Sequence, residues 1–114
     1  MPTNVIIGEF EQLVLLGLLR LGDTAYALPL RKELSRLAQR SISRGALYRT
    51  LDRLEQKGLL EWELEREIPK RGGHPRRRFR VTRRGLLTLA ASRKVLLEMW
   101  SGLEKTLDET VQTS

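Results

Sequence analysis

Basic side chains that can bind a polyanion are concentrated in one short segment of this 114-residue chain. Residues 70–84 hold eight of the 21 Lys and Arg residues and none of the 14 Asp and Glu residues, so the net charge of +7 resides in this segment. Arg and Lys neutralise phosphates and release condensed counterions, which makes such a segment typical of a nucleic-acid contact. The residues in it that we expect to contact DNA are Lys70, Arg71, Gly72, Gly73, Arg76, Arg77 and Arg78.

A second set of candidate binding residues lies on a predicted helix that runs from residue 43 to 57. Leucines at three- and four-residue spacing form one face of this helix, and Arg49 and Arg53 project from the opposite side. A helix with an exposed basic face fits the major groove of DNA and can read base edges. The candidates for this contact are Ser43, Arg44, Tyr48, Arg49 and Arg53.

Each of these groups also has an interpretation that involves no DNA. Arg49 and Arg53 can pair with Asp52 on the helix surface, and the basic segment can be a solvated loop, although mixed charges suit that role better. Ser43 is first of all the expected N-cap of the helix. Tyr48 lies beside the leucine face and can simply pack there, but we expect a mixed role in which its ring packs partly while its hydroxyl reaches a phosphate.

Residue types needed for other chemistry are scarce. The chain has no cysteine and one histidine, His74, so we expect neither a metal site nor a cofactor. The carboxylates of Glu61, Glu63 and Glu65 alternate along a strand instead of gathering in a pocket, and we expect the chain not to be an enzyme. The longest apolar run, residues 13–19, is too short to cross a bilayer, so we expect an intact cytoplasmic protein without a membrane partner.

These residues must be positioned by a mainly α-helical fold with a small β-hairpin. The predicted elements are helices over 8–21, 26–39 and 43–57, strands over 60–65 and 78–82, and a last helix from 83 to about 107. Gly72-Gly73 marks the turn between the strands, and Trp62 is expected in the strand core. This order predicts a winged helix-turn-helix domain over 1–82, a long C-terminal dimerisation helix over 83–110 and a loose tail over 111–114.

Three stretches of the sequence form recognisable motifs: GEFEQLVLLGLLRLGDTAYALPLRKEL at 8–34, SRGALYRTLDRLEQKGLL at 43–60 and RGGHPRRRFRVTRRG at 71–85. Together they resemble the PadR family of bacterial transcriptional regulators, with the middle motif the most specific. The resemblance implies winged-helix homodimers in which a C-terminal helix packs on the first helix of the partner. The single last helix resembles the short members. One departure is Arg78-Phe79, where the family often has two aromatic residues.

Apolar residues also indicate a second subunit. The helix over 8–21 is apolar on more than one face, and the last helix carries more apolar surface than a small monomer leaves exposed. The residues expected at the dimer interface are Phe10, Leu13, Leu89, Leu96, Trp100, Leu103 and Leu107. Trp100 has two interpretations. It packs within the interface, or the paired Trp100 side chains wall a pocket for a flat hydrophobic effector, which the family resemblance permits.

The leading hypothesis is a homodimeric, sequence-specific DNA-binding repressor that acts on an inverted-repeat operator and is released by a small aromatic effector if one exists. The first alternative is an architectural protein that binds double-stranded DNA through phosphates alone. A third interpretation is a protein-interaction module whose basic hairpin meets an acidic partner. Competition with random DNA separates the first two, since a specific binder prefers its site by about a thousandfold or more.

Overall fold

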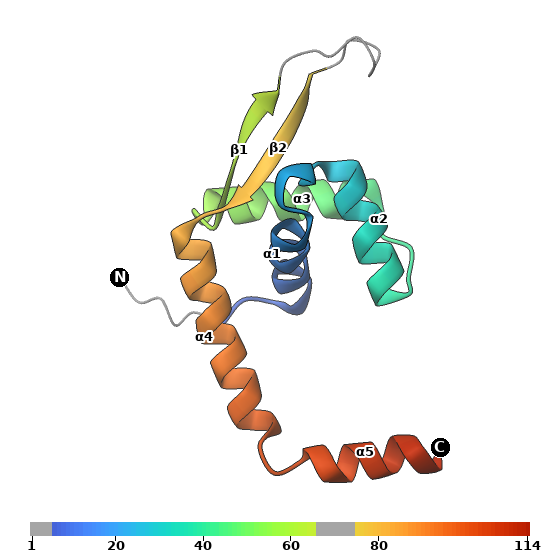
Figure 1. Ribbon diagram of the computed structural model, residues 1–114. Helices are drawn as coiled ribbons and strands as arrows, with labels where there is room; N and C mark the ends of the chain where they lie inside the picture. The colour runs from blue at the N-terminus through green and yellow to red at the C-terminus, as the bar shows by residue number, and fades with distance from the viewer. Residues whose placement is uncertain (1–5, 66–74) are drawn as a thin grey trace.

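The computed structural model describes residues 6–65 and 75–114, which form helices and one antiparallel hairpin (Figure 1). The elements are α1 (Glu9–Leu21), a 3-10 turn η1 (Gly22–Thr24), α2 (Ala27–Ala38), α3 (Arg44–Gln56), β1 (Leu60–Glu65), β2 (Arg76–Val81), α4 (Arg83–Trp100) and α5 (Glu104–Thr113). This order confirms the predicted winged helix-turn-helix architecture. None of these helices in the described part of the chain is long and apolar enough to cross a membrane.

α1 lies at the centre of the molecule and is covered by elements of its own chain. It contacts α2, α3, β2 and α4, and Figure 1 shows it between α2 and α4. Its Val14, Leu15 and Leu18 are buried in the core, together with leucines of α2, α3 and β1. Leu16 and Leu19 remain 44% and 45% exposed. Packing within the chain therefore accounts for most, but not all, of the apolar surface of α1.

Three residues predicted at a dimer interface pack within their own chain. Phe10 and Leu13 of α1 are partly buried against the core, and Leu89 of α4 is itself a core residue. Leu89 is therefore not part of the exposed apolar stripe that the sequence predicts, because the first turns of α4 pack against the core of their own chain. The other predicted interface residues are exposed, namely Leu96, Trp100, Leu103 and Leu107.

β1 and β2 pair in antiparallel fashion, with Leu60 opposite Val81 and Trp62 opposite Phe79. The Phe79 N–H donates a hydrogen bond to the Ala25 carbonyl at 2.9 Å, which ties β2 to the residues just before α2. Leu60 and Phe79 are buried at the base of the hairpin. The prediction that Trp62 lies in the strand core is wrong, because this side chain is 37% exposed. Beyond this level the hairpin projects past the helices (Figure 1).

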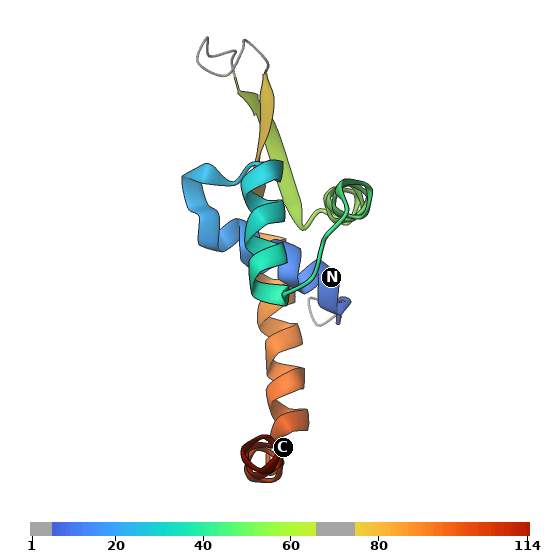
Figure 2. The ribbon, with the colours of Figure 1, turned by 90° about the vertical axis from the view of Figure 1, so that its right-hand side faces the viewer.

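The C-terminal region contains two helices where the sequence predicts one. α4 ends at Trp100 and α5 begins at Glu104. Between them, Gly102 has a φ of 86°, a conformation that residues with a Cβ rarely adopt and that commonly ends helices. The predicted continuous helix and the predicted loose tail are both wrong, since α5 extends to Thr113. Figure 2 shows α4 leaving the body and α5 lying at its far end.

The start of α4 is fixed against the turn that follows α3. The Thr82 hydroxyl accepts a hydrogen bond from the Gly85 N–H at 3.1 Å, which confirms Thr82 as the N-cap. Gly85 lies against the Leu59 carbonyl, and a Cβ added to it would stand 2.7 Å from Cγ1 of Val81. The absence of a side chain at Gly85 therefore sets how closely α4 approaches the base of the hairpin.

Candidate nucleic-acid interface

The N-terminal half of α3 presents basic side chains with no acidic residue among them. The Ser43 hydroxyl accepts a hydrogen bond from a backbone N–H of the first turn at 3.1 Å, which confirms Ser43 as the N-cap. Arg49 lies back over this turn, with Nη1 3.2 Å from the position that a Cβ on Gly45 would occupy. The exposed Arg44 has its guanidinium carbon 5.4 Å from the centre of the Tyr48 ring.

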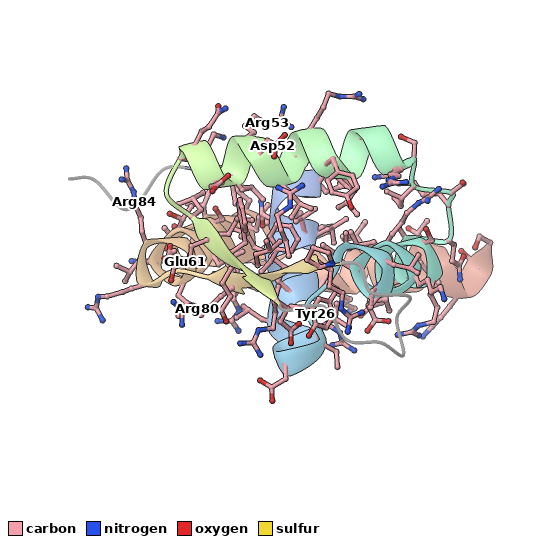
Figure 3. The ribbon with its side chains drawn as sticks, turned by 90° about the horizontal axis from the view of Figure 1, so that it is seen from above. Tyr26, Asp52, Arg53, Glu61, Arg80 and Arg84 are labelled. Atoms are coloured by element: carbon pink, nitrogen blue, oxygen red, sulfur yellow. The ribbon has the colours of Figure 1, made fainter. Side chains whose placement is uncertain are left out.

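The C-terminal half of α3 is bound to α1 by ionic contacts. Nε of Arg53 lies 3.3 Å from Oε2 of Glu11, and Nζ of Lys57 lies 2.9 Å from the same oxygen. The partner of Arg53 is therefore Glu11 of α1 and not Asp52, the partner in the alternative interpretation without DNA. Figure 3 shows Arg53 on the edge of α3 that faces away from the hairpin. This location leaves Arg53 more than half exposed although it is paired.

The environment of Glu11 favours its ionised form. Burial raises the pKa of this carboxyl, but the hydrogen bond and charge of Lys57 lower it, with further lowering from the Gly8 N–H and from Arg53. The net pKa lies below the ordinary value of glutamate. Glu11 is therefore charged at neutral pH, and it offsets positive charge at this end of α3.

One face of the hairpin carries a ladder of opposite charges. The strand register places Glu61, Glu63 and Glu65 opposite Arg80, Arg78 and Arg76. Arg78 contacts Glu63 at 2.6 Å and Arg80 contacts Glu61, and Figure 3 shows the latter pair on the hairpin side of the molecule. The hydrogen bond from Arg78 lowers the pKa of Glu63. The hairpin is therefore less positive than its sequence suggests, and Arg78, a predicted DNA contact, has a partner in its own chain.

The two other arginines at the start of β2 stack on aromatic rings. The guanidinium carbon of Arg76 lies 3.4 Å from the centre of the Tyr26 ring, and that of Arg77 lies 5.7 Å from the centre of the Tyr48 ring. Cations over aromatic faces are held in place without losing their charge. Arg76 and Arg77 therefore remain available as charged groups beside α2 and α3.

Two grooves adjoin Tyr48 and collect basic side chains from three elements. A groove of about 620 Å³ between the start of α2 and β2 has Lys32, Arg76 and Arg77 as its basic lining residues. A second groove of about 260 Å³ between α2 and α3 has Arg31 and Arg44. Among the residues that the structure describes, no Asp or Glu lines either groove. The structure thus brings residues of the predicted recognition helix and of the predicted wing together on one basic surface.

The contribution of α2 to this surface was missing from the sequence-based prediction. The adjacent cations Arg31 and Lys32, near the start of a helix that precedes the recognition helix, were the available signal. Arg31 Nε also donates a hydrogen bond to the Ile42 carbonyl at 2.6 Å, which joins α2 to the α2–α3 connection. Four predicted wing residues lie outside the described residues, namely Lys70, Arg71, Gly72 and Gly73. Within the described ranges, no cluster of residues could hold a metal ion.

Comparisons with known proteins place this arrangement in a family. Residues 15–91 match the model of the PadR-like family of transcriptional regulators. A PadR family transcriptional regulator from Eggerthella lenta is 31% identical, with 93% of this chain and 88% of its own covered and a TM-score of 0.59. A PadR-like transcription factor from Bacteroides fragilis is 26% identical, with 89% of this chain and 88% of its own covered and a TM-score of 0.60.

The fold is also found in a more distant structure. RosR of H. salinarum is 22% identical, with 95% of this chain and 96% of its own covered and a TM-score of 0.61. No curated protein matches the sequence. The family match spans well over half of the chain and includes α2, α3, the hairpin and the start of α4. The chain therefore belongs to the PadR-like family of transcriptional regulators, as a winged-helix DNA-binding protein and not an enzyme.

Proposed function

We propose that this chain is a homodimeric transcriptional repressor that binds an inverted-repeat operator. The observation that carries the proposal is the pair of grooves around Tyr48, whose basic residues come from α2, α3 and β2. A DNA backbone that lies along these grooves meets cations from three elements, which sets the register of the protein on the duplex. Binding then weakens steeply with salt because counterions are released.

Within this surface, the N-terminal half of α3 supplies the base contacts. The N-terminal residues of a recognition helix meet base edges when the helix lies in the major groove. The residues proposed for α3 are Ser43, Arg44, Tyr48 and Arg49. Arg49 and Arg44 are exposed and have the planar donor group that binds guanine in a bidentate manner. Arg76 and Arg77 of the hairpin bind phosphates beside them and contribute affinity without sequence preference.

The homodimer is proposed from apolar surface that the single chain leaves uncovered. Leu16 and Leu19 of α1, Leu96 and Trp100 of α4, and the α5 residue Leu107 are all exposed by more than two fifths. A soluble monomer rarely leaves so many large apolar side chains exposed. Two copies joined through these helices place two α3 helices about one turn of DNA, roughly 34 Å, apart.

The same interface is the proposed place of an effector. Trp100 stands near the end of α4 with 48% of its surface exposed. In a dimer, paired Trp100 side chains form the walls of a site for a flat hydrophobic ligand, which releases the operator by changing the spacing of the two α3 helices. We place this regulation in the cytoplasm, where bacterial operators lie.

Selection of bound fragments from random double-stranded DNA tests the function. We expect enrichment of an inverted repeat that outcompetes random DNA by about a thousandfold or more. Binding without enrichment of any sequence would make the chain an architectural DNA-binding protein, and absence of binding would overturn the proposal. The selection repeated with a panel of flat aromatic compounds tests the effector site, with Trp100→Ala as the control that loses the response.

A further inference from the structure

Among the ion pairs in the described residues, those at the end of α3 have the most buried carboxylate, Glu11. The Glu11 side chain is 10% exposed, whereas Glu63 in the hairpin pair is 67% exposed. Both Glu11 carboxylate oxygens accept hydrogen bonds from Lys57 Nζ, at 3.1 and 2.9 Å, and Oε2 also accepts one from Arg53 Nε at 3.3 Å. The Gly8 N–H adds a fourth contact at 3.4 Å.

Burial makes these contacts costly to break. A carboxylate that loses its partners while it stays out of water pays a large desolvation penalty, whereas an exposed pair such as Arg78–Glu63 is replaced by water at little cost. A DNA phosphate that draws both Arg53 and Lys57 away leaves the buried Glu11 carboxylate without a cationic partner. Arg53 and Lys57 are 54% and 45% exposed, so they are accessible to a phosphate but already engaged.

The charges along α3 are distributed unevenly as a result. The first half of the helix holds Arg44 and Arg49 and no acidic residue. In the second half and at its end, Asp52 and Glu55 already balance the cations Arg53 and Lys57 before Glu11 is considered. With Glu11 ionised, the second half of α3 has a negative balance, and the positive potential of the helix lies at its N-terminal end.

We propose that Glu11 is a specificity-determining residue that holds Arg53 and Lys57 back from the phosphates of DNA. Glu11 thereby confines DNA contact on α3 to the N-terminal half, where Arg44 and Arg49 read bases, and it suppresses binding to unrelated sequences. This inference rests on the proposed DNA-binding function. It reverses the sequence-based expectation that Arg53 contacts DNA.

The test is Glu11→Gln, which keeps the size of the side chain and removes its charge. The variant frees Arg53 and Lys57, so we expect tighter binding to random DNA and a smaller preference for the selected site. The slope of log affinity against log salt should steepen by roughly one to two units, because each added phosphate contact contributes about 0.9. A thermal melt of the same sample verifies that the variant is folded.

Glu33→Gln is the matched control. Glu33 is also a mostly buried carboxylate with two cationic partners, Arg36 at 2.6 Å and Arg20 at 3.7 Å, but it lies on α2 and these partners belong to α2 and α1. Glu33→Gln changes the net charge by the same amount as Glu11→Gln. We expect its salt slope to equal that of the wild type. Equal slopes for Glu11→Gln and Glu33→Gln, or weaker binding of Glu11→Gln to all DNA, would overturn the proposal.

A second set of variants covers the case in which Glu11→Gln does not fold. Arg53→Gln in an otherwise unchanged chain should leave the salt slope within experimental error of the wild type, whereas Arg49→Gln should lower it or abolish the sequence preference. If the slope of log affinity against log salt falls in Arg53→Gln by the amount that one phosphate contact contributes, the role of Glu11 is contradicted. Failure of the wild type to bind any DNA would overturn the proposed function itself, and the inference with it.

Discussion

The guanidinium of Arg76 lies 3.4 Å from the centre of the Tyr26 ring, and this contact fastens the hairpin to the start of α2. The Tyr26 hydroxyl completes it by donating a hydrogen bond to the carboxylate of Glu65, the cross-strand neighbour of Arg76. Together with the hydrogen bond from Phe79 to Ala25, these contacts hold the hairpin at a fixed angle to α2. The wing of this regulator is therefore oriented by contacts along its strands, as far as the last described cross-strand pair.

Tyr26→Phe tests this attachment through its pH dependence. The hydrogen bond to Glu65 raises the pKa of Tyr26, with burial adding to the rise, so the folded chain holds the phenolic proton more tightly than the unfolded chain. The stabilisation is fully present below the unfolded-state pKa of about 10 and is lost as pH rises through the higher folded-state pKa. We expect the wild type to have a higher melting temperature than Tyr26→Phe at pH 8. The two melting temperatures should converge above pH 10. A constant difference up to pH 11 would contradict this account.

A side chain at Gly85 should destabilise the fold. The Cβ of Gly85→Ala would press against the Leu59 carbonyl and stand 2.7 Å from Val81 Cγ1. Overpacking of this kind costs about 1–3 kcal/mol of unfolding free energy, which urea denaturation measures. Gly8→Ala serves as the control because its Cβ meets nothing closer than 3.9 Å. Equal stability of Gly85→Ala and wild type would show that α4 does not dock as described.

Gly45→Ala should separate stability from DNA binding. Alanine within a helix is favoured over glycine by roughly 0.5–1 kcal/mol, so the unfolding free energy should rise. The new Cβ would stand 3.2 Å from Nη1 of Arg49, so this guanidinium must shift by a few tenths of an ångström. Affinity for the selected site should fall by up to the 1–3 kcal/mol that a bidentate base contact is worth. Unchanged affinity in a fluorescence titration would remove Arg49 from the proposed base readout.

Charged residues on the exposed face of α4 and α5 should abolish the proposed dimer. Leu96→Glu combined with Leu103→Glu places two carboxylates in apolar surface, and we expect a monomer by analytical ultracentrifugation with far weaker operator binding. Leu37→Glu on α2 is the control, because Leu37 is 51% exposed like Leu103 but lies outside the proposed interface. A double variant that sediments as a dimer would refute this interface.

Local signals in the sequence were sufficient for most of the fold. Ser43 and Thr82 precede apolar periodicity and cap their helices as predicted. The alternation from Leu60 onward gave the hairpin, and its limits agree with the structure within two residues. The break after Trp100 had a signal too, the glycine at position 102, but the apolar stripe that continues across it concealed the stop.

The candidate site was less predictable because its decisive contacts join distant parts of the chain. Glu11 and Arg53 are 42 residues apart, and nothing in the local pattern of α3 distinguishes a partner on α1 from the neighbouring Asp52. The pairing of Arg78 with Glu63 depends on strand register, which the length of the turn sets. Charge counting along the sequence therefore located the basic surface but overestimated how many of its cations are free.

The most direct test of the central claim is hydroxyl-radical footprinting of the purified protein on the sequence selected from random DNA. A homodimer that reads bases with two α3 helices should protect two symmetric half-sites whose centres lie about 34 Å, or one helical turn, apart. Arg49→Ala should abolish the preference for this site over random DNA while phosphate-dependent binding persists. Continuous protection without symmetry, or a preference that survives Arg49→Ala, would contradict the account.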